Sequence, residues 1–230
     1  QSDRCAILLH GYADAKIGSI AWAPLMLELG YHVLAVDLRA HGHSDGRDTT
    51  AGYFERHDIS QVIDQLRTLR PGKTRQIILL GISMGAAVAA ATANVRDDIA
   101  AIILDSPYAH FRQAARAHAS HAGLPGDIFL RGGWNLAQWQ TGAHFEEVDP
   151  VKTIPTARCP VMVISATKDL LVSPDEQAAL QSAIHSRSDS SEFWTQDADH
   201  VLNLPSNPEE YLGRMRQFLM NLPKPSATNS

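Results

Sequence analysis

The sequence predicts an α/β fold, in which a mostly parallel sheet carries helices on both of its faces. Apolar runs alternate along the chain with segments of helical periodicity, which is the order of elements in such folds. The runs are continuously apolar, as strands buried on both faces are. With 230 residues, 44% of them hydrophobic and 20% charged, the chain suits one domain with a sizeable core.

Six apolar runs are expected to form the strands of this sheet. In order, they cover residues 5–9, 31–36, 76–82, 99–104, 161–165 and 192–195. The chain contains no internal repeat, which argues against a solenoid. Residues 1–222 are therefore expected to form a single domain, followed by a frayed tail at 223–230.

Helices are expected in the connections between these strands. They are placed at 19–29, around 59–66, at 84–95, at 174–184 and from 208 onward. Apolar side chains from Ile59 to Leu66 follow the i, i+3, i+4, i+7 spacing of one helix face. Gly30 is suited to end the first helix, and Ser173 with Glu176 forms a capping box that begins the fourth.

The segment 107–154, between the fourth and fifth strands, is too long for a simple connection. We expect a short helical, cap-like insertion over the carboxyl edge of the sheet, because the segment joins the end of one strand to the start of the next. Ligands bind at that edge in open α/β sheets. Its large apolar side chains are therefore expected to line a pocket, and the alternative for each is that it only packs the insertion onto the sheet. They are Phe111, Phe129, Leu130, Trp134 and Trp139.

Charge and cysteine content exclude several classes of function. The net charge of −5 argues against non-specific binding of nucleic acid. The two cysteines, Cys5 and Cys159, are too few for a disulfide framework or a Cys-rich zinc site, and the eleven histidines form no metal-binding motif. No metal, cofactor or nucleic-acid partner is expected.

The stretch 76–95 carries no charged residue and is long enough to span a bilayer. Its middle reads Gly-Ile-Ser-Met-Gly, after a β-type run and before an Ala-rich helical run. A strand, a sharp turn and a helix buried in the sheet account for it better, so no transmembrane segment is expected. The chain begins at Gln1 without Met or a signal peptide, which we interpret as the start of a trimmed or mature fragment.

The same stretch supplies the clearest functional motif. Residues 81–85 match G-x-S-x-G between a strand and a helix, the context in which this short motif marks a nucleophile. The chain turns so sharply there that only small residues fit two positions on either side of Ser83. Its Oγ is expected to project above the sheet, with the Met84 N–H facing any oxyanion that forms.

The turn after the first strand is expected to complete the oxyanion site. It reads His10-Gly11-Tyr12. Gly11 lets the backbone bend toward Ser83, so that the Tyr12 N–H supplies a second donor beside the Met84 N–H. In this interpretation the His10 side chain only packs below the site.

Two loops at the carboxyl edge supply an acid and a base. Asp169 follows the fifth strand, and His200 lies on the loop after the last strand. A carboxylate in that position can orient a histidine and stabilise its imidazolium. Asp105, after the fourth strand, is the rival acid. Asp37, after the second strand, is expected to hold its own loop in place.

Together these residues resemble those of the α/β-hydrolase superfamily. Ser83, Asp169 and His200 stand in its nucleophile–acid–histidine order, and the His-Gly turn and the final helix also look like that family. The resemblance extends over 6–222 and is closest to small serine hydrolases of the esterase, lysophospholipase and serine-aminopeptidase-like kind. The family's sheet usually has two more strands before the His-Gly strand, and this chain has no room for them.

The resemblance implies hydrolysis of carboxylic esters of a small-molecule substrate, through a Ser-His-Asp triad and an acyl-enzyme intermediate, without a cofactor. A peptidase or amide hydrolase with the same triad, and a non-catalytic binding scaffold of this fold, are the alternatives. Ser83 argues against dehalogenases, epoxide hydrolases and dienelactone hydrolases, whose elbows carry Asp or Cys, while perhydrolases and C–C bond hydrolases stay open. Substrate contacts are expected from Tyr108, Trp134, Trp139, Leu170 and Val201.

Overall fold

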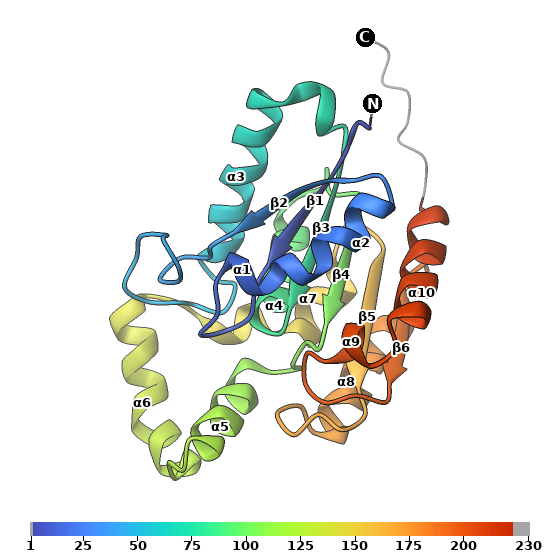
Figure 1. Cartoon of the computed structure of the whole chain (residues 1–230). Coiled ribbons are helices and arrows are strands. Elements are labelled where there is room, and N and C mark those ends of the chain that lie inside the picture. Colours follow the sequence, from blue (N-terminus) through green and yellow to red (C-terminus); the bar gives the residue numbers. More distant parts are fainter. Residues whose placement is uncertain (1, 223–230) are drawn as a thin grey trace.

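In the computed structural model, which describes residues 2–222 apart from the side chains of 128 and 129, six strands form one parallel sheet (Figure 1). They are β1 (Arg4–Leu9), β2 (His32–Val36), β3 (Gln76–Ile82), β4 (Ala101–Asp105), β5 (Val161–Ala166) and β6 (Glu192–Gln196). Their order across the sheet is β2-β1-β3-β4-β5-β6, and each neighbouring pair is parallel. The predicted fold class is confirmed.

The chain reverses its direction of travel across the sheet between β1 and β3. After β1 it adds β2 on one side, then crosses back to β3 and builds the rest of the sheet on the other side. Open α/β sheets bind ligands outside the carboxyl ends of the strands at such a point. The turns after β1 and β3 are therefore where a binding site is expected.

Helices occupy the connections between the strands. They are α1 (Lys16–Ser19), α2 (Ala23–Glu28), α3 (Glu55–Leu69), α4 (Met84–Val95), α5 (Phe111–His121), α6 (Gly126–Thr141), α7 (Pro150–Thr156), α8 (Pro174–His185), α9 (Asn203–Ser206) and α10 (Pro208–Met220), with 3-10 turns η1 (Ile20–Trp22), η2 (Pro71–Lys73) and η3 (Phe145–Glu147). Along residues 2–222, no helix combines the length and the hydropathy needed to cross a bilayer.

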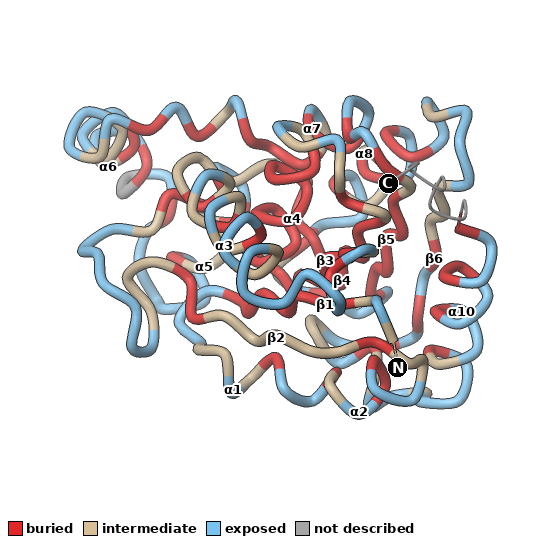
Figure 2. The backbone as a smooth tube through the Cα atoms, turned by 90° about the horizontal axis from the view of Figure 1, so that it is seen from above, coloured by how far each residue is buried: buried red, intermediate tan, exposed pale blue. Residues whose placement is uncertain are grey.

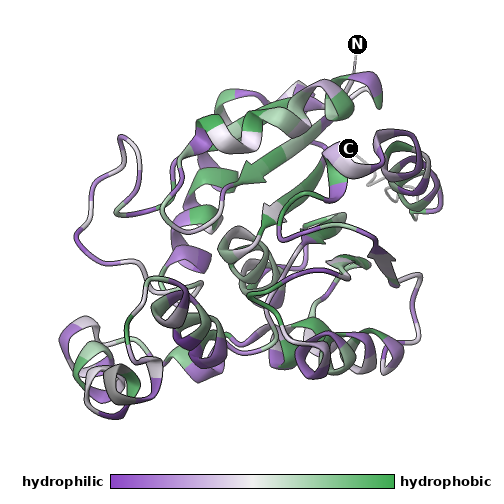
Figure 3. Ribbon diagram, turned by 60° about the horizontal axis from the view of Figure 1, so that its bottom comes forward, coloured by the Kyte–Doolittle hydropathy of each residue, from purple (hydrophilic) through white to green (hydrophobic). Residues whose placement is uncertain are grey.

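Alternate residues of the strands face two separate cores. Ile7 and Leu79 point to the face covered by α3, α4, α7 and α8. Leu8 and Leu80 point to the face covered by α2 and α10. The central strands and α4 are almost wholly buried (Figure 2), and hydrophobic residues concentrate along those strands (Figure 3). This two-sided burial explains why the strand sequences are continuously apolar.

The first predicted helix is divided in the structure. The sequence predicts one helix over 19–29, whereas the chain forms α1, η1 and α2 there. Pro24 lies in the first turn of α2, where its missing N–H removes no hydrogen bond, and it disfavours a helix that continues through it. Gly30 does end the segment, with a φ of 81°. The other predicted elements agree with the structure to within a few residues.

The connection from β4 to β5 contains α5 and α6, which pack against each other beyond the carboxyl ends of the strands (Figure 1). Buried residues of α6 and the chain after it form the α6 cluster, which consists of Leu130, Trp134, Ala143 and Phe145. That 107–154 is a cap-like insertion in a single domain stays a prediction. The predicted frayed tail, 223–230, lies outside the described residues.

Candidate active site

The turn between β3 and α4 holds Ser83 in a strained conformation. Ser83 has φ 52° and ψ −113°, values that non-glycine residues rarely adopt. A Cβ on Gly81 would lie 2.1 Å from the Gly85 carbonyl oxygen, and one on Gly85 would lie 2.2 Å from the Leu9 carbonyl oxygen. Only glycine fits at either position, so the two glycines are required by the turn.

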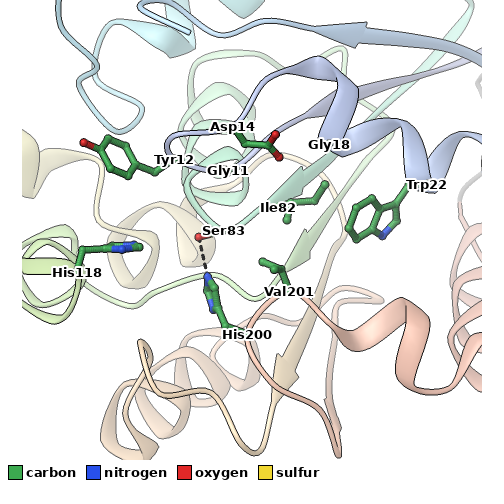
Figure 4. A pocket seen from close by; sticks show the side chains of 10 residues that line it. All are labelled: Gly11, Tyr12, Asp14, Gly18, Trp22, Ile82, Ser83, His118, His200 and Val201. Carbon is green, nitrogen blue, oxygen red and sulfur yellow. Dashed lines mark hydrogen bonds between the residues drawn. The ribbon is translucent and has the colours of Figure 1, made fainter. Parts of the chain in front are cut away.

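Three side chains meet at this turn. His200 Nε2 lies 3.0 Å from Ser83 Oγ (Figure 4), and His200 Nδ1 lies 2.6 Å from Asp169 Oδ2. A histidine that carries its proton on Nδ1 donates to Asp169 and presents the lone pair of Nε2 to the Ser83 hydroxyl. This is the geometry that a histidine needs to act as a base toward a serine.

Asp169 is itself fixed by the backbone. Its Oδ1 accepts hydrogen bonds from the N–H groups of Leu171, at 2.8 Å, and Val172, at 3.0 Å. Its side chain is 1% exposed, whereas the His200 side chain is 19% exposed. The carboxylate therefore keeps one oxygen for the histidine and is shielded from water.

Asp105, the rival acid, is engaged elsewhere. Its carboxylate accepts hydrogen bonds from Asn203 Nδ2 and from the Tyr211 hydroxyl, each at 2.7 Å. Burial raises the pKa of this carboxyl, and these hydrogen bonds oppose the shift. Of the two candidate acids, Asp169 is the one hydrogen-bonded to the histidine.

The turn after β1 passes close to Ser83. A Cβ on Gly11 would lie 3.5 Å from the Ser83 Cβ. Met84 is the first residue of α4, where an N–H has no acceptor within the helix and the helix dipole favours negative charge. The Tyr12 and Met84 N–H groups belong to the two turns that meet here, and paired N–H groups of this kind can stabilise an oxyanion.

His10 and Asp37 support the loops around the site. His10 is fully buried, its Nε2 accepts a hydrogen bond from the Leu38 N–H at 3.0 Å, and burial lowers its pKa. Asp37 accepts from the backbone N–H groups of Lys16 and His43 and pairs with the Lys16 ammonium. Hydrogen bonds from Lys16 hold the pKa of Asp37 well below its usual range. These contacts agree with the predicted loop-holding role of Asp37.

A pocket of about 220 Å³ opens at the turn of Ser83 (Figure 4). Trp22, Ile82 and Val201 form an apolar wall on one side of Ser83, and Tyr12 and His118 lie on the other. Pockets for drug-sized ligands measure roughly 300–1,000 Å³. The smaller volume here suits a small chemical group.

The structure places most of the predicted substrate contacts away from this pocket. Val201 does line it. Tyr108 is buried in a different cluster, and Trp134 belongs to the α6 cluster. Trp139 and Leu170 are 82% and 86% exposed. None of these four side chains lines this pocket, and their contact with a substrate stays a prediction.

The reason is that the insertion has a small core of its own. The rings of Phe111, Trp134 and Phe145 lie with centroids 5.1–5.6 Å apart, at distances typical of aromatic pairs. They bury one another, and the Trp134 Nε1 donates to Glu146 at 2.7 Å. From this insertion the pocket receives His118, on α5. The side chain of Phe129 lies outside the described residues.

Trp22 and His118 are among the pocket residues that were not predicted from the sequence. Trp22 falls in the stretch predicted as a continuous helix, and no local pattern distinguishes a pocket wall from a core position there. His118 reaches the pocket only through the packing of α5. Burial and the neighbouring His200 lower the pKa of His118, which favours its neutral form.

Among the described residues, the cysteines and the possible metal ligands form no second reactive centre. Within residues 2–222, no group of three or more His, Cys, Asp or Glu side chains is placed to hold a metal ion. Cys5 and Cys159 are buried free thiols, and burial raises their pKa values to about 11 and about 12. Thiols in that state are poor nucleophiles at neutral pH.

The chain belongs to the alpha/beta hydrolase family, whose sequence model matches residues 6–214. It is similar to the uncharacterized protein YqkD of Bacillus subtilis, with 29% identity over 223 residues that cover 94% of this chain and 71% of that protein.

Solved structures give the same picture. The structure of the esterase Pf2001 of Pyrococcus furiosus has a TM-score of 0.78 and 29% identity, covering 96% of this chain and 84% of that one. The enol-lactonase of Burkholderia xenovorans LB400 shares the fold, with a TM-score of 0.63, 24% identity and coverage of 96% and 93%. Family membership and an esterase among the similar structures support hydrolase activity.

Proposed function

We propose that this protein is a serine esterase that cleaves carboxylic esters of small acyl groups. Ser83 is the nucleophile, His200 the general base and acid, and Asp169 the carboxylate that orients the histidine. The observation that carries the proposal is the simultaneous placement of the two His200 ring nitrogens, 3.0 Å from Ser83 Oγ and 2.6 Å from Asp169 Oδ2. The likeness to the Pyrococcus furiosus esterase supports an ester as substrate.

In the acylation half, Ser83 Oγ attacks the ester carbonyl carbon while His200 Nε2 takes the hydroxyl proton. The carbonyl oxygen becomes an oxyanion, which the Tyr12 and Met84 N–H groups stabilise. The carbon–oxygen bond to the alcohol then breaks, and the His200 imidazolium returns its proton to the leaving alkoxide. Asp169 stabilises the imidazolium and keeps its Nδ1 oriented.

In the deacylation half, water replaces the alcohol. His200 Nε2 takes a proton from the water as its oxygen attacks the acyl carbon. The oxyanion forms again at the same N–H groups. The acyl–oxygen bond to Ser83 breaks, the proton passes from His200 to Ser83 Oγ, and the carboxylic acid leaves.

The pocket favours small acyl groups. Its apolar wall, Trp22, Ile82 and Val201, lies beside Ser83, where the acyl part of the substrate would be held during attack. A volume of about 220 Å³ leaves room for a short chain rather than a long lipid. We therefore expect kcat/KM to be greatest for short acyl chains and to fall as the chain lengthens.

The test is a series of p-nitrophenyl esters of rising acyl length, beside a series of aminoacyl anilides, with purified wild-type protein. We expect turnover of the short esters and covalent labelling of Ser83 by a fluorophosphonate probe. Turnover of anilides in preference to esters would replace the proposal with an amide hydrolase that uses the same residues. Absence of both turnover and labelling would favour a non-catalytic scaffold.

A further inference from the structure

Asp105, at the end of β4, carries a buried carboxylate that takes no part in the proposed mechanism. It is fully buried, and all of its hydrogen-bond partners are uncharged. Its Oδ1 accepts from Asn203 Nδ2 at 2.7 Å and from Ser106 Oγ at 3.0 Å, and its Oδ2 accepts from the Tyr211 hydroxyl at 2.7 Å. Burying a carboxylate is costly unless donors of this kind satisfy it. Such a network is rigid, and it can fix the position of the segments that donate to it.

One element that it holds is the loop of His200. Asn203 follows three residues after His200 and donates from Nδ2 to both Asp105 Oδ1 and Ser106 Oγ, the second at 3.0 Å. The Val201 N–H donates to the same Ser106 hydroxyl at 3.0 Å. Val201 has a φ of 58°, which a β-branched residue avoids. The loop therefore needs external contacts to keep this conformation.

The other element that it holds is the turn of Ser83. The Ser83 N–H donates to the backbone carbonyl of Asp105 at 2.8 Å, directly after the register in which Ile82 pairs with Asp105. Ser83 has a φ of 52°, so this turn is strained as well. Asp105 thus contacts the nucleophile's residue through its main chain and the loop of the histidine through its side chain.

Resting on the proposed function, we propose that Asp105 and Asn203 are positioning residues that fix His200 at hydrogen-bonding distance from Ser83. The main chain of Asp105 locates the turn of Ser83. Its carboxylate, through Asn203, locates the histidine loop. The positions of Ser83 and His200 therefore both depend on Asp105. A misplacement of about 1 Å in such a pair costs on the order of 10²-fold in rate.

Tyr211 offers a matched control, because it donates to the same carboxylate from α10 rather than from the histidine loop. Its hydroxyl also accepts a hydrogen bond from Trp22 Nε1 at 2.9 Å. Tyr211→Phe removes one donor from Asp105, as Asn203→Ala does, but leaves Asn203 and its contacts with Asp105 and Ser106 in place. Both variants are expected to lower the melting temperature. Only Asn203→Ala removes a contact with the His200 loop, whereas Tyr211→Phe also removes the acceptor of Trp22 Nε1.

The experiment compares Asn203→Ala, Tyr211→Phe and wild-type protein on a short p-nitrophenyl ester, at a temperature at which circular dichroism shows all three folded. For Asn203→Ala we expect kcat to fall about 10- to 100-fold with KM within about twofold, because the histidine is displaced while Trp22 and Ile82 keep their places in the pocket wall. The rate of fluorophosphonate labelling of Ser83 should fall in parallel. Tyr211→Phe should keep kcat within about threefold of the wild-type value.

Two results would overturn the proposal. One is a folded Asn203→Ala protein with wild-type kcat and labelling rate, and the other is an equal loss in Tyr211→Phe, which would mean that the carboxylate serves overall stability alone. If Asn203→Ala does not fold, Ser106→Ala, which removes the acceptor of the Val201 N–H, takes its place with the same expected and contrary results. Failure of wild-type protein to turn over any ester would remove the proposed function, whereas relative labelling rates test positioning independently of substrate.

Discussion

The turn after β3 and the two-helix insertion after β4 both lie at the carboxyl edge of the sheet, but different interactions hold them. The turn is fixed by close backbone approaches and by directional hydrogen bonds, such as the one from the Ser83 N–H to the Asp105 carbonyl oxygen. The insertion is held by aromatic packing within the α6 cluster. Directional contacts locate atoms to within fractions of an ångström, whereas apolar packing tolerates rearrangement as long as volume is conserved.

The turn and its partner loops therefore tolerate few substitutions, whereas the insertion tolerates many. Contacts that fix Ser83, His200 and Asp169 relative to one another leave little freedom for substitution. The insertion can change many side chains without disturbing them, because it contributes His118 to the pocket and buries Trp134 and Phe145 in the α6 cluster. Substitutions in the two regions should therefore differ in their effects on activity and stability.

Ser83→Ala should have the largest effect on activity. Removing the nucleophile of a triad lowers kcat by about 10⁶-fold in well-studied cases, and the fold should be unchanged because alanine fits where serine does. The measurement is kcat on the best ester together with the melting temperature. A purified variant with near-wild-type turnover would sink the assignment of Ser83.

Asp169→Asn should cause the second-largest loss of kcat. An asparagine there can hold the wrong histidine tautomer, which costs about 10⁴-fold in the serine-protease example. Asp105→Asn, the matched control in the rival acid, should lose far less, about 10- to 100-fold, because it displaces His200 without removing its hydrogen-bond partner. The reverse ranking, in two folded proteins, would show that the acid has been misassigned.

Glycine substitutions probe the two regions directly. A Cβ at Gly85 meets the Leu9 carbonyl oxygen at 2.2 Å, whereas one at Gly133, within α6, meets nothing within 4 Å. Gly85→Ala should destabilise the fold by about 1–3 kcal/mol or more through overpacking. Gly133→Ala should stabilise it by about 0.5–1 kcal/mol, because alanine is the better helix former. Denaturant unfolding measures both changes in the free energy of unfolding. Equal changes in the two variants would contradict the difference in tolerance between the turn and the insertion.

Tryptophan substitutions test which region sets acyl-chain selectivity. Trp22→Ala enlarges the pocket and should shift the optimum of kcat/KM toward longer esters. For the acyl chain that gains room, kcat/KM should rise by up to about tenfold. Trp139→Ala, on the exposed side of α6, should leave the profile unchanged. A shifted optimum in Trp139→Ala, with none in Trp22→Ala, would return selectivity to the insertion.

Acid should weaken the loop that Asp37 holds. The unfolded carboxyl titrates near pH 3.9, and hydrogen bonds from Lys16 lower its pKa in the folded state. The stabilisation is therefore complete above the unfolded pKa and is lost as pH falls toward the folded one. Asp37→Asn should cost about 1–3 kcal/mol at pH 7 and at pH 5. The gap in melting temperature to wild-type protein should narrow near pH 3, and a constant gap would contradict this account.

The sequence predicted the sheet well because its signals are local. Continuous apolar runs mark strands buried on both faces, and the glycines around Ser83 mark a turn that no other residue permits. The order of Ser83, Asp169 and His200 along the chain also predicted which side chains would meet, and these three do lie within hydrogen-bonding distance. Their catalytic roles stay a proposal.

The pocket walls could not be predicted in the same way. Which face of α5 or α6 turns toward the sheet depends on packing between distant segments. An apolar ring such as that of Trp134 can be buried against Phe145 as well as against a substrate. Trp22 reaches the pocket from the 3-10 turn η1, which ends directly before α2. Neither outcome has a signature in the neighbouring residues.

The charge-free stretch 76–95 has a consequence for synthesis of the chain. In the folded protein every residue from Met84 to Ala93 is buried, so α4 has no position there for a charge that would discourage aggregation. On the ribosome, this segment emerges before β4, β5 and β6, when β3 can pair with β1 alone. The open edge of β3, and the surface of α4 that packs on β4 and α7, stay uncovered until the second half of the chain follows. The nascent protein is therefore most exposed to misassembly, and most in need of chaperone cover, midway through translation.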